Sequence, residues 1–401
     1  MKLSPETRYK FNKFKKNRKA YFSFIVLSLM FLASLPAELI FNDQPLMLNV
    51  DGKFYFPLIK DYSMLDFGGT SKVPITNYVG KDFTNFLNGG QEKKLDTSDL
   101  FGSDDEDNKK VDTNKAAADS ATAKKSYWFL WAPIRHSYKS NTENPKSGES
   151  VLAAPWEKHG ADNTTLRGAW IDQHYLGTDK EGKDVLARIV YGFRISVIFG
   201  LCLALTETVL GCIIGAIQGY FGGLIDLLGQ RLIEIWGSIP QLFLLIILSS
   251  FLANRAELTS FKLYLMLFGI VNLTSWMGMA TFMRAEFLKG RNLDYVKAAR
   301  ALGASNFKIM LKHILPNSLT PLVTFLPFAI TSGILALVSL DFLALGVKYP
   351  SPSLGDLLKQ GQDNLFALWI ILPTFFILSF TLTLLTFIGD GIRNAFDPRS
   401  H

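Results

Sequence analysis

The chain carries six long apolar runs in which charged side chains are nearly absent. A helix needs about 20 such residues to cross the hydrocarbon core of a membrane. The only charged residues inside the runs are Glu38 and Glu207. The runs occupy residues 21–41, 195–225, 235–254, 263–283, 314–340 and 365–389. This pattern predicts an all-α polytopic membrane protein with six transmembrane helices.

Lysine and arginine are concentrated in two of the segments that flank these runs. Short basic segments stay in the cytoplasm, whereas long loops are exported largely regardless of their charge. We therefore expect the N-terminus, the segment between the fourth and fifth runs and, because the number of spans is even, the C-terminus to be cytoplasmic. The basic residues are Lys2, Arg8, Lys10, Lys13, Lys15, Lys16, Arg18 and Lys19 in the first segment, and Arg284, Lys289, Arg291, Lys297, Arg300, Lys308 and Lys312 in the second.

The first run has an alternative interpretation as a cleavable signal peptide, because a basic leader precedes it and small residues occur around Ala33 and Ala37. We favour a retained helix, since the leader is long and the run reaches spanning length. Cleavage would also leave five spans and no explanation for the orientation of the remaining loops.

A long insert separates the first two runs, and the topology predicts that it lies outside the cytoplasmic membrane. Asp51-Gly52 between alternating residues predicts a β-hairpin at residues 46–57. Residues 96–125 contain almost no large apolar side chains, so we expect a disordered or mobile loop there, with order resuming at Tyr127. The predicted organisation is a basic N-terminus (1–20), a first helix (21–41), the insert (42–194) and a five-helix core (195–401).

Composition narrows the possible chemistry. The net charge is +7, but the basic residues outside the insert lie beside apolar runs, which indicates a topology signal rather than a nucleic-acid surface. Cys202 and Cys212 both fall in the second run, so we predict small apolar core residues and no disulfide framework. The five histidines form no H-E-x-x-H pattern, and no metal site is predicted.

Two further sequence patterns bear on ligand binding, a nucleotide-binding loop and a calcium-binding loop. No G-x-x-x-x-G-K-[ST] sequence occurs, so a phosphate-binding loop that could supply energy from within this chain is missing, and we predict no cofactor and no catalytic residue in this chain. Residues 179–184 have acidic residues spaced loosely like those of a calcium loop. Lys180 and Lys183 oppose that charge and the full ligand set is missing, which favours a capped turn.

The segment between the fourth and fifth runs, residues 284–317, encodes two short helices. Asp294 can cap a helix that Gly303 ends, with Tyr295, Ala298, Ala299 and Leu302 on one face. Ser305 can cap a second helix, whose apolar residues Phe307, Met310, Leu311, Ile314 and Leu315 precede a stop or kink at Pro316. The small exposed face suits docking of another protein, and an interfacial helix pair on lipid headgroups is an equal alternative on physical grounds.

This segment resembles the EAA loop of binding-protein-dependent ABC importer permeases. The matching residues are Ala298–Gly303, followed after ten residues by Ile314-Leu315-Pro316, with Lys297 standing where the family has a glutamate. The resemblance implies a coupling helix that inserts into a groove on an ATPase subunit. It also implies the six-helix type I ABC importer permease fold.

Other motifs resemble the dipeptide and oligopeptide branch of this family. They are residues 174–188, 191–196, 219–223, 341–346 and 352–355. In the insert, residues 42–46, 51–57, 66–69 and 130–135 resemble the permeases of Yej-type importers, which take up peptides and the peptide-nucleotide antibiotic microcin C. The resemblance implies a subunit of a bacterial inner-membrane importer for peptides, with nickel as the alternative substrate within the family. The implied partners are a second, B-type permease, ATP-binding subunits and a periplasmic peptide-binding protein.

Glu207 stands out because it lies near the middle of the second run. An exposed charge there would cost about 3 kcal/mol or more, so its side chain should face protein or a water-filled interior, or be protonated. Two interpretations remain open. Glu207 lines the translocation path and binds a peptide amine, or it is a neutral, hydrogen-bonded packing residue.

Overall fold

The computed structural model describes residues 5–69, 75, 78, 81–89, 125–140, 152–156, 174–253, 260–346 and 351–396. The chain forms two compact units, which we call the helix unit (residues 1–35 and 141–401) and the small unit (residues 36–140). Each unit has a hydrophobic core of its own.

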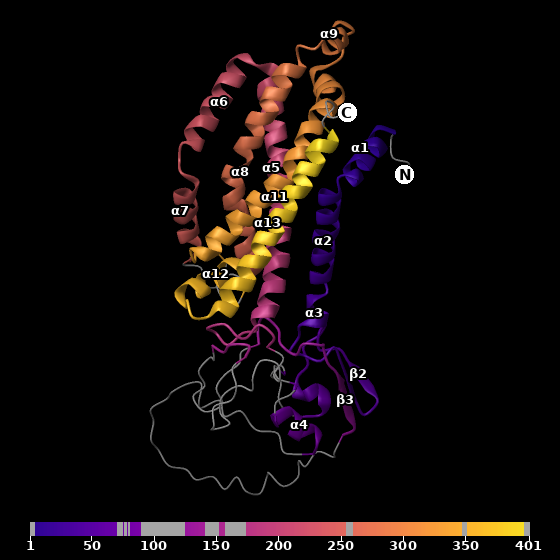
Figure 1. The fold of residues 1–401 in the computed structure, drawn as a ribbon, viewed down its shortest axis with the longest axis vertical. Coiled ribbons are helices and arrows are strands. Elements are labelled where there is room, and N and C mark those ends of the chain that lie inside the picture. Colours follow the sequence, from indigo (N-terminus) through magenta and orange to yellow (C-terminus); the bar gives the residue numbers. More distant parts are fainter. Residues whose placement is uncertain are drawn as a thin grey trace. The chain divides into compact units, whose positions relative to one another are not determined.

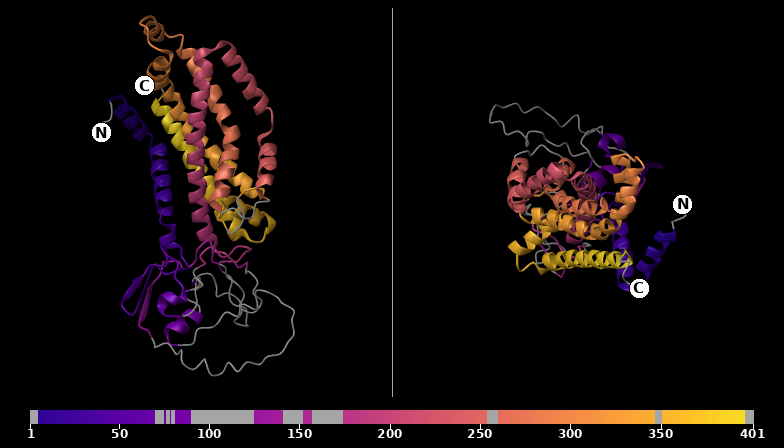
Figure 2. Two further views of the ribbon diagram at one scale, coloured as in Figure 1. Left: turned by 180° about the vertical axis from the view of Figure 1, so that it is seen from behind. Right: turned by 90° about the horizontal axis from the view of Figure 1, so that it is seen from above.

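The helix unit is a bundle whose long helices run side by side (Figures 1 and 2). In chain order its elements are α1 (Pro5–Lys16), α2 (Arg18–Ser34), α5 (Val185–Phe221), α6 (Gly223–Gly237), α7 (Gln241–Ala253), α8 (Ser260–Gly290), α9 (Asp294–Ala301), α10 (Asn306–Lys308), the π-helical turn η3 (Ile309–Ile314), α11 (Leu315–Phe342), α12 (Leu354–Asp363) and α13 (Leu368–Phe396). The short helix α9 lies at one end of the bundle and α12 at the other (Figure 1).

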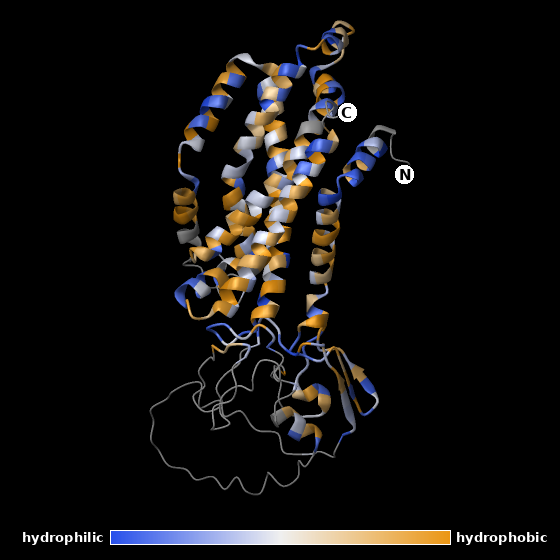
Figure 3. Cartoon of the chain, viewed as in Figure 1, coloured by the Kyte–Doolittle hydropathy of each residue, from blue (hydrophilic) through white to orange (hydrophobic). Residues whose placement is uncertain are grey.

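Four helices of this unit are long and apolar enough to cross a membrane, namely α5, α8, α11 and α13. Apolar residues cover most of their length in Figure 3, whereas polar residues gather on α9 and α1. The bent pair α6 and α7 raises the number of candidate spans to five if the pair counts as one. The described residues therefore form a mostly helical protein with four or five apolar spans.

Three of the predicted runs differ from the helices that form. The run at 235–254 is broken, because α6 and α7 meet at 73° around Ser238-Ile239-Pro240. A residue before proline is disfavoured in the helical conformation, which explains the break. The run at 195–225 forms only part of α5, which already begins at Val185 and ends at Phe221.

The first run, 21–41, is also interrupted. Helix α2 has 17 residues, which corresponds to a length of about 26 Å. It ends at Ser34, and Pro36 precedes the single turn α3 (Ala37–Ile40), which belongs to the small unit. Proline lacks the backbone N–H that a continuing helix would use, which explains the interruption of the run at this position.

Glycine spacing allows α5 and α8 to pack closely. Gly211, Gly215 and Gly219 recur every four residues on one face of α5. A Cβ atom at Gly215 would lie 2.3 Å from the backbone oxygen of Ala280, and one at Gly219 would lie 2.4 Å from that of Arg284. Larger side chains at these positions would force the two helices apart.

The small unit departs from the all-α prediction, because it contains a three-stranded antiparallel sheet in the order β2-β1-β3. The predicted hairpin is confirmed. Strands β1 (Met47–Val50) and β2 (Lys53–Tyr55) are joined at Asp51-Gly52, both with positive φ angles. Strand β3 (Tyr127–Leu130) forms where the sequence predicts ordered structure, and residues 96–124 of the predicted loop lie outside the described residues.

Apolar side chains of one sheet face pack against short helical segments of the same unit. These are the 3-10 turn η1 (Met64–Phe67) and helix α4 (Lys81–Leu87). The core includes Leu48, Val50, Phe67, Phe83 and Phe86. The small unit therefore has its own fold, which includes the first part of the segment predicted as the insert, residues 42–140.

Candidate functional site

The predicted helix, turn and helix between the fourth and fifth runs are present. We call residues 291–314, which connect α8 to α11, the α9 loop. Gly303 ends the first helix with φ +78°. Its N–H donates to the backbone oxygen of Arg300 at 3.0 Å, and the N–H of Ala304 donates to that of Ala299 at 3.1 Å. This pair of bonds is a Schellman cap, in which glycine adopts the left-handed conformation at low cost.

The predicted cap at Asp294 is wrong by one residue. Leu293 occupies the N-cap position in an extended conformation, and no side chain caps the helix there. Asp294 is instead the first helical residue, and its fully exposed carboxylate lies 3.3 Å from Lys297 Nζ. An acidic side chain in the first turn still interacts favourably with the helix dipole.

Of the stop or kink predicted at Pro316, the stop is wrong. The chain remains helical from Asn306 through η3 into α11, and Pro316 lies in the first turn of α11. Proline is tolerated there because its missing N–H coincides with the change from π-helical to α-helical bonding. The predicted cap at Ser305 is confirmed, since its side chain accepts a bond from Lys308 N at 3.4 Å.

The α9 loop has a buried side and an exposed side. Val296, Ile309 and Ile314 are buried in a cluster that also contains Met283 and Phe287 of α8. Sequence reasoning missed Val296, although it follows Tyr295 directly in the motif. Of the face predicted for α9, Tyr295, Ala298 and Leu302 are exposed, while Ala299 is half-buried against the cluster. Leu315, predicted in the second helix, is also half-buried there.

Two large apolar side chains project beside the turn at Gly303. Leu302 is 88% exposed and Phe307 is 72% exposed. A Cβ atom at Gly303 would meet nothing within 4 Å, so the surface around the turn is open. Asn317 Nδ2 of α11 donates to the Tyr295 hydroxyl at 2.8 Å, which ties α9 to the following helix. The loop thus has an exposed apolar tip, formed by Leu302 and Phe307, and a base that is bonded to α11 through Asn317.

Glu207 lines a cavity inside the helix unit. Side chains of α5, α7, α8 and α11 line this cavity, which is partly open to the surface and has a volume of about 690 Å³, and Glu207 is 9% exposed. Among the described residues that line the cavity, Glu207 is the single ionisable one. Its polar neighbours in the lining are Gln241, Thr274, Ser275, Ser332 and Ser339, and the remaining surface is mostly apolar. This arrangement can hold one positively charged group of a largely apolar or amphipathic ligand.

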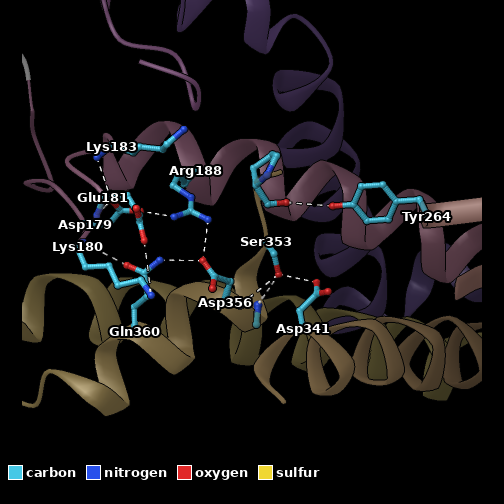
Figure 4. A network of polar contacts seen from close by, with 12 residues as sticks. Asp179, Lys180, Glu181, Lys183, Arg188, Tyr264, Asp341, Ser353, Asp356 and Gln360 are labelled. Carbon is cyan, nitrogen blue, oxygen red and sulfur yellow. Dashed lines mark hydrogen bonds and ion pairs between the residues drawn. The ribbon is translucent and has the colours of Figure 1, made fainter. Parts of the chain in front are cut away.

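A polar network lies at the end of the helix unit opposite α9 (Figure 4). Arg188 of α5 is fully buried, and its guanidinium pairs with Asp179 and, at 2.8 Å, with Asp356 of α12. Gln360 Nε2 donates to the same carboxylate oxygen of Asp356 at 2.8 Å. The turn before α5 and helix α12 are therefore joined through one arginine.

The turn at residues 179–184 is capped as predicted. Asp179 Oδ1 accepts bonds from the backbone N–H groups of Glu181 and Lys183, both at 2.9 Å. Asp184 is the N-cap of α5, where its carboxylate accepts a bond from Ala187 N at 2.7 Å. Beside α12, Ser353 Oγ donates to Asp341 Oδ2 at 2.5 Å (Figure 4).

Two remaining predictions concern the cysteines and metal binding. Cys202 and Cys212 are free thiols on α5. Cys212 is half-buried, but Cys202 is exposed in this chain, so its predicted place in the core is wrong. Within the described part of the chain, no group of three or more His, Cys, Asp or Glu residues is arranged to hold a metal ion.

Comparison with known proteins identifies the family. The model described as "Binding-protein-dependent transport system inner membrane component" matches residues 208–401. The peptidoglycan transport system permease protein YejE of Agrobacterium fabrum is 39% identical over 99% of this chain and 94% of the relative. The inner membrane ABC transporter permease protein YejE of Escherichia coli is 39% identical over 99% of this chain and 98% of the relative. The dipeptide transport system permease protein DppC of Haemophilus influenzae is 35% identical over 62% of this chain and 85% of the relative. The resemblance inferred from the motifs is confirmed, and the chain belongs to the multi-pass inner-membrane permeases of binding-protein-dependent ABC transport systems.

Proposed function

We propose that this chain is the permease subunit of an ATP-driven importer that moves peptides across the bacterial inner membrane. The observation that carries the proposal is its similarity, over nearly the whole chain, to two YejE permeases. The named substrates of the similar proteins are peptidoglycan and dipeptides, which favours peptides over nickel. Peptide conjugates of the microcin C type fall within the same class.

The proposed topology has six spans, with α2 as the first and the bent pair of α6 and α7 as the third. Both termini and the α9 loop are then cytoplasmic, as the basic residues of these segments favour. The small unit lies on the periplasmic side, where a peptide-binding protein delivers the substrate.

The α9 loop is the proposed contact with an ATP-binding subunit, which binds ATP and Mg²⁺ and hydrolyses the nucleotide. Support comes from the exposed tip at Leu302 and Phe307, which no described residue of this chain covers. The residues assigned to this coupling surface and its base are Asp294, Tyr295, Ala298, Ala299, Leu302, Gly303, Ile314, Leu315 and Pro316. A second, B-type permease completes the pathway.

Glu207 is proposed to line that pathway and to bind the α-amino group of the peptide. A carboxylate at this depth costs several kcal/mol unless it is paired or solvated, and an ammonium group would supply the pair. The cavity of about 690 Å³ falls in the size range of small-ligand sites.

The experiment that tests this function is uptake by proteoliposomes that contain the complete complex and its binding protein. We expect ATP-dependent accumulation of labelled trialanine and no accumulation of radiolabelled nickel. Nickel uptake without peptide uptake would contradict the proposal. In the same vesicles, Glu207→Gln should lower trialanine uptake about tenfold, whereas Glu286→Gln, which alters a carboxyl group of α8 that does not line the cavity, should leave it unchanged. Equal uptake by the two variants would show that Glu207 does not take part in peptide transport.

A further inference from the structure

Tyr220, near the end of α5, contacts the α9 loop on both sides of its turn. The hydroxyl donates to Asn306 Oδ1 at 2.8 Å and accepts a bond from Arg300 Nη2 at 3.4 Å. Arg300 belongs to α9 and Asn306 follows Gly303, so a single hydroxyl bridges the two arms of the loop. Tyr220 is only 5% exposed, which keeps these bonds away from bulk solvent.

Two further contacts attach the loop to the same residue. Arg291, where the loop begins, donates from Nη1 to the backbone oxygen of Tyr220 at 3.3 Å. The guanidinium of Arg300 also lies 5.7 Å from the centre of the Tyr220 ring. The ring itself packs in the cluster with Val296 and Ile309 of the loop. Tyr220 thus contacts the start of the loop at Arg291, helix α9 at Arg300 and the segment after the turn at Asn306.

Helix α5 connects this attachment point to the centre of the helix unit. It is one continuous helix of 37 residues, and its glycine face packs closely on α8. Glu207 lies thirteen residues before Tyr220 on α5, which corresponds to a rise of about 20 Å. One continuous helix therefore joins Tyr220 to the wall of the Glu207 cavity.

We propose that Tyr220 is the positioning residue through which movement of the α9 loop reaches α5 and the cavity. The proposal rests on the proposed function, because it requires the loop to be moved by an ATP-binding subunit. To that function the proposal adds the residue through which movement of the loop reaches the cavity inside this chain. The hydroxyl sets the angle between the loop and α5, and its two bonds make loop and helix move together.

Tyr220→Phe tests this route, because it keeps the packed ring and removes only the hydroxyl. We expect the reconstituted complex to retain its ATP-binding subunit and to hydrolyse ATP within twofold of the wild-type basal rate. Peptide transported per ATP hydrolysed should fall at least fivefold. Asn306→Ala should also lower this ratio, and the double variant should be no worse than Tyr220→Phe, because Tyr220→Phe already lacks the bond to Asn306. Asn306→Asp keeps an acceptor for the hydroxyl and should restore most of the coupling.

Tyr264→Phe is the matched control, since its hydroxyl donates to the Pro352 oxygen at 3.4 Å near α12, at the other end of the helix unit. It should transport like the wild type. The proposal is overturned if Tyr220→Phe keeps wild-type transport per ATP, or if both Tyr variants lose transport equally. It is also overturned if the loss in the Tyr220→Phe/Asn306→Ala double variant equals the product of the two single losses. Failure of the proposed function would look different, because the wild-type complex itself would then not accumulate peptide.

Discussion

Replacing Leu302 by glutamate is expected to detach the ATP-binding subunit from the complex. Leu302 is 88% exposed in this chain, at the end of α9 and beside the open turn at Gly303. Burying a leucine side chain at an interface contributes about 1.5–3 kcal/mol. A carboxylate in the same place loses that contribution and adds the cost of burying an unpaired charge. Because each 1.4 kcal/mol is a factor of ten, we expect a loss of affinity of at least about 100-fold.

The measurement is the amount of ATP-binding subunit that copurifies with the tagged permease in detergent. Leu302→Met is the matched control, because methionine keeps the size and apolar character of the side chain and should retain the partner. Phe307→Glu should resemble Leu302→Glu, since Phe307 lies on the other side of the turn. Normal copurification of Leu302→Glu would show that the exposed tip is not the docking surface.

Arg188→Met should cause the largest loss of stability of any single change in the helix unit that we consider. Its guanidinium is fully buried between Asp179, which is also buried, and Asp356, which is 37% exposed. Removal of the cation leaves an uncompensated buried carboxylate at Asp179. Breaking a buried ion pair in this way costs about 3–5 kcal/mol, whereas the solvent-screened contact with Asp356 adds little.

Thermal unfolding of the detergent-purified chain measures this effect. Adding Asp179→Asn to Arg188→Met should recover part of the lost stability, because the amide carries no charge and Oδ1 still accepts the bonds that form the turn. Arg231→Gln is the control, since Arg231 forms an exposed ion pair with Glu234 that contributes about 1 kcal/mol or less. If Arg188→Met unfolds at the same temperature as Arg231→Gln, the network does not stabilise the fold.

The sequence predicts those parts of the fold that depend on local patterns. Apolar runs mark α5, α8, α11 and α13, because length and hydropathy alone decide whether a helix suits a membrane. Gly303 marks the end of α9, because few other residues adopt its φ angle. The hairpin at Asp51-Gly52 follows from turn chemistry in the same way.

The parts that the sequence does not predict depend on contacts between distant residues. Arg188 and Asp356 are 168 positions apart, and Tyr220 and Asn306 are 86 apart, so no local periodicity relates them. Strand β3 pairs with β1 across more than 70 residues, and neither strand alone reveals the partner. The errors at Asp294 and Pro316 have a local cause, because extended Leu293 and the π-helical turn move the helix boundaries.

The coupling role of the α9 loop is tested most directly with reconstituted complexes that carry Gly303→Asp. The measured quantities are ATP hydrolysis and peptide uptake. Aspartate adds strain at φ +78° and a negative charge at the end of α9, which the helix dipole disfavours. Gly303→Asn is the control, because asparagine adopts this conformation at lower cost and is neutral. We predict that the Gly303→Asp complex assembles but loses stimulation of ATP hydrolysis by binding protein and peptide, together with at least about 90% of uptake, while Gly303→Asn keeps most of both. Intact stimulation and uptake in Gly303→Asp would contradict a coupling role for the loop and leave it an ordinary surface element.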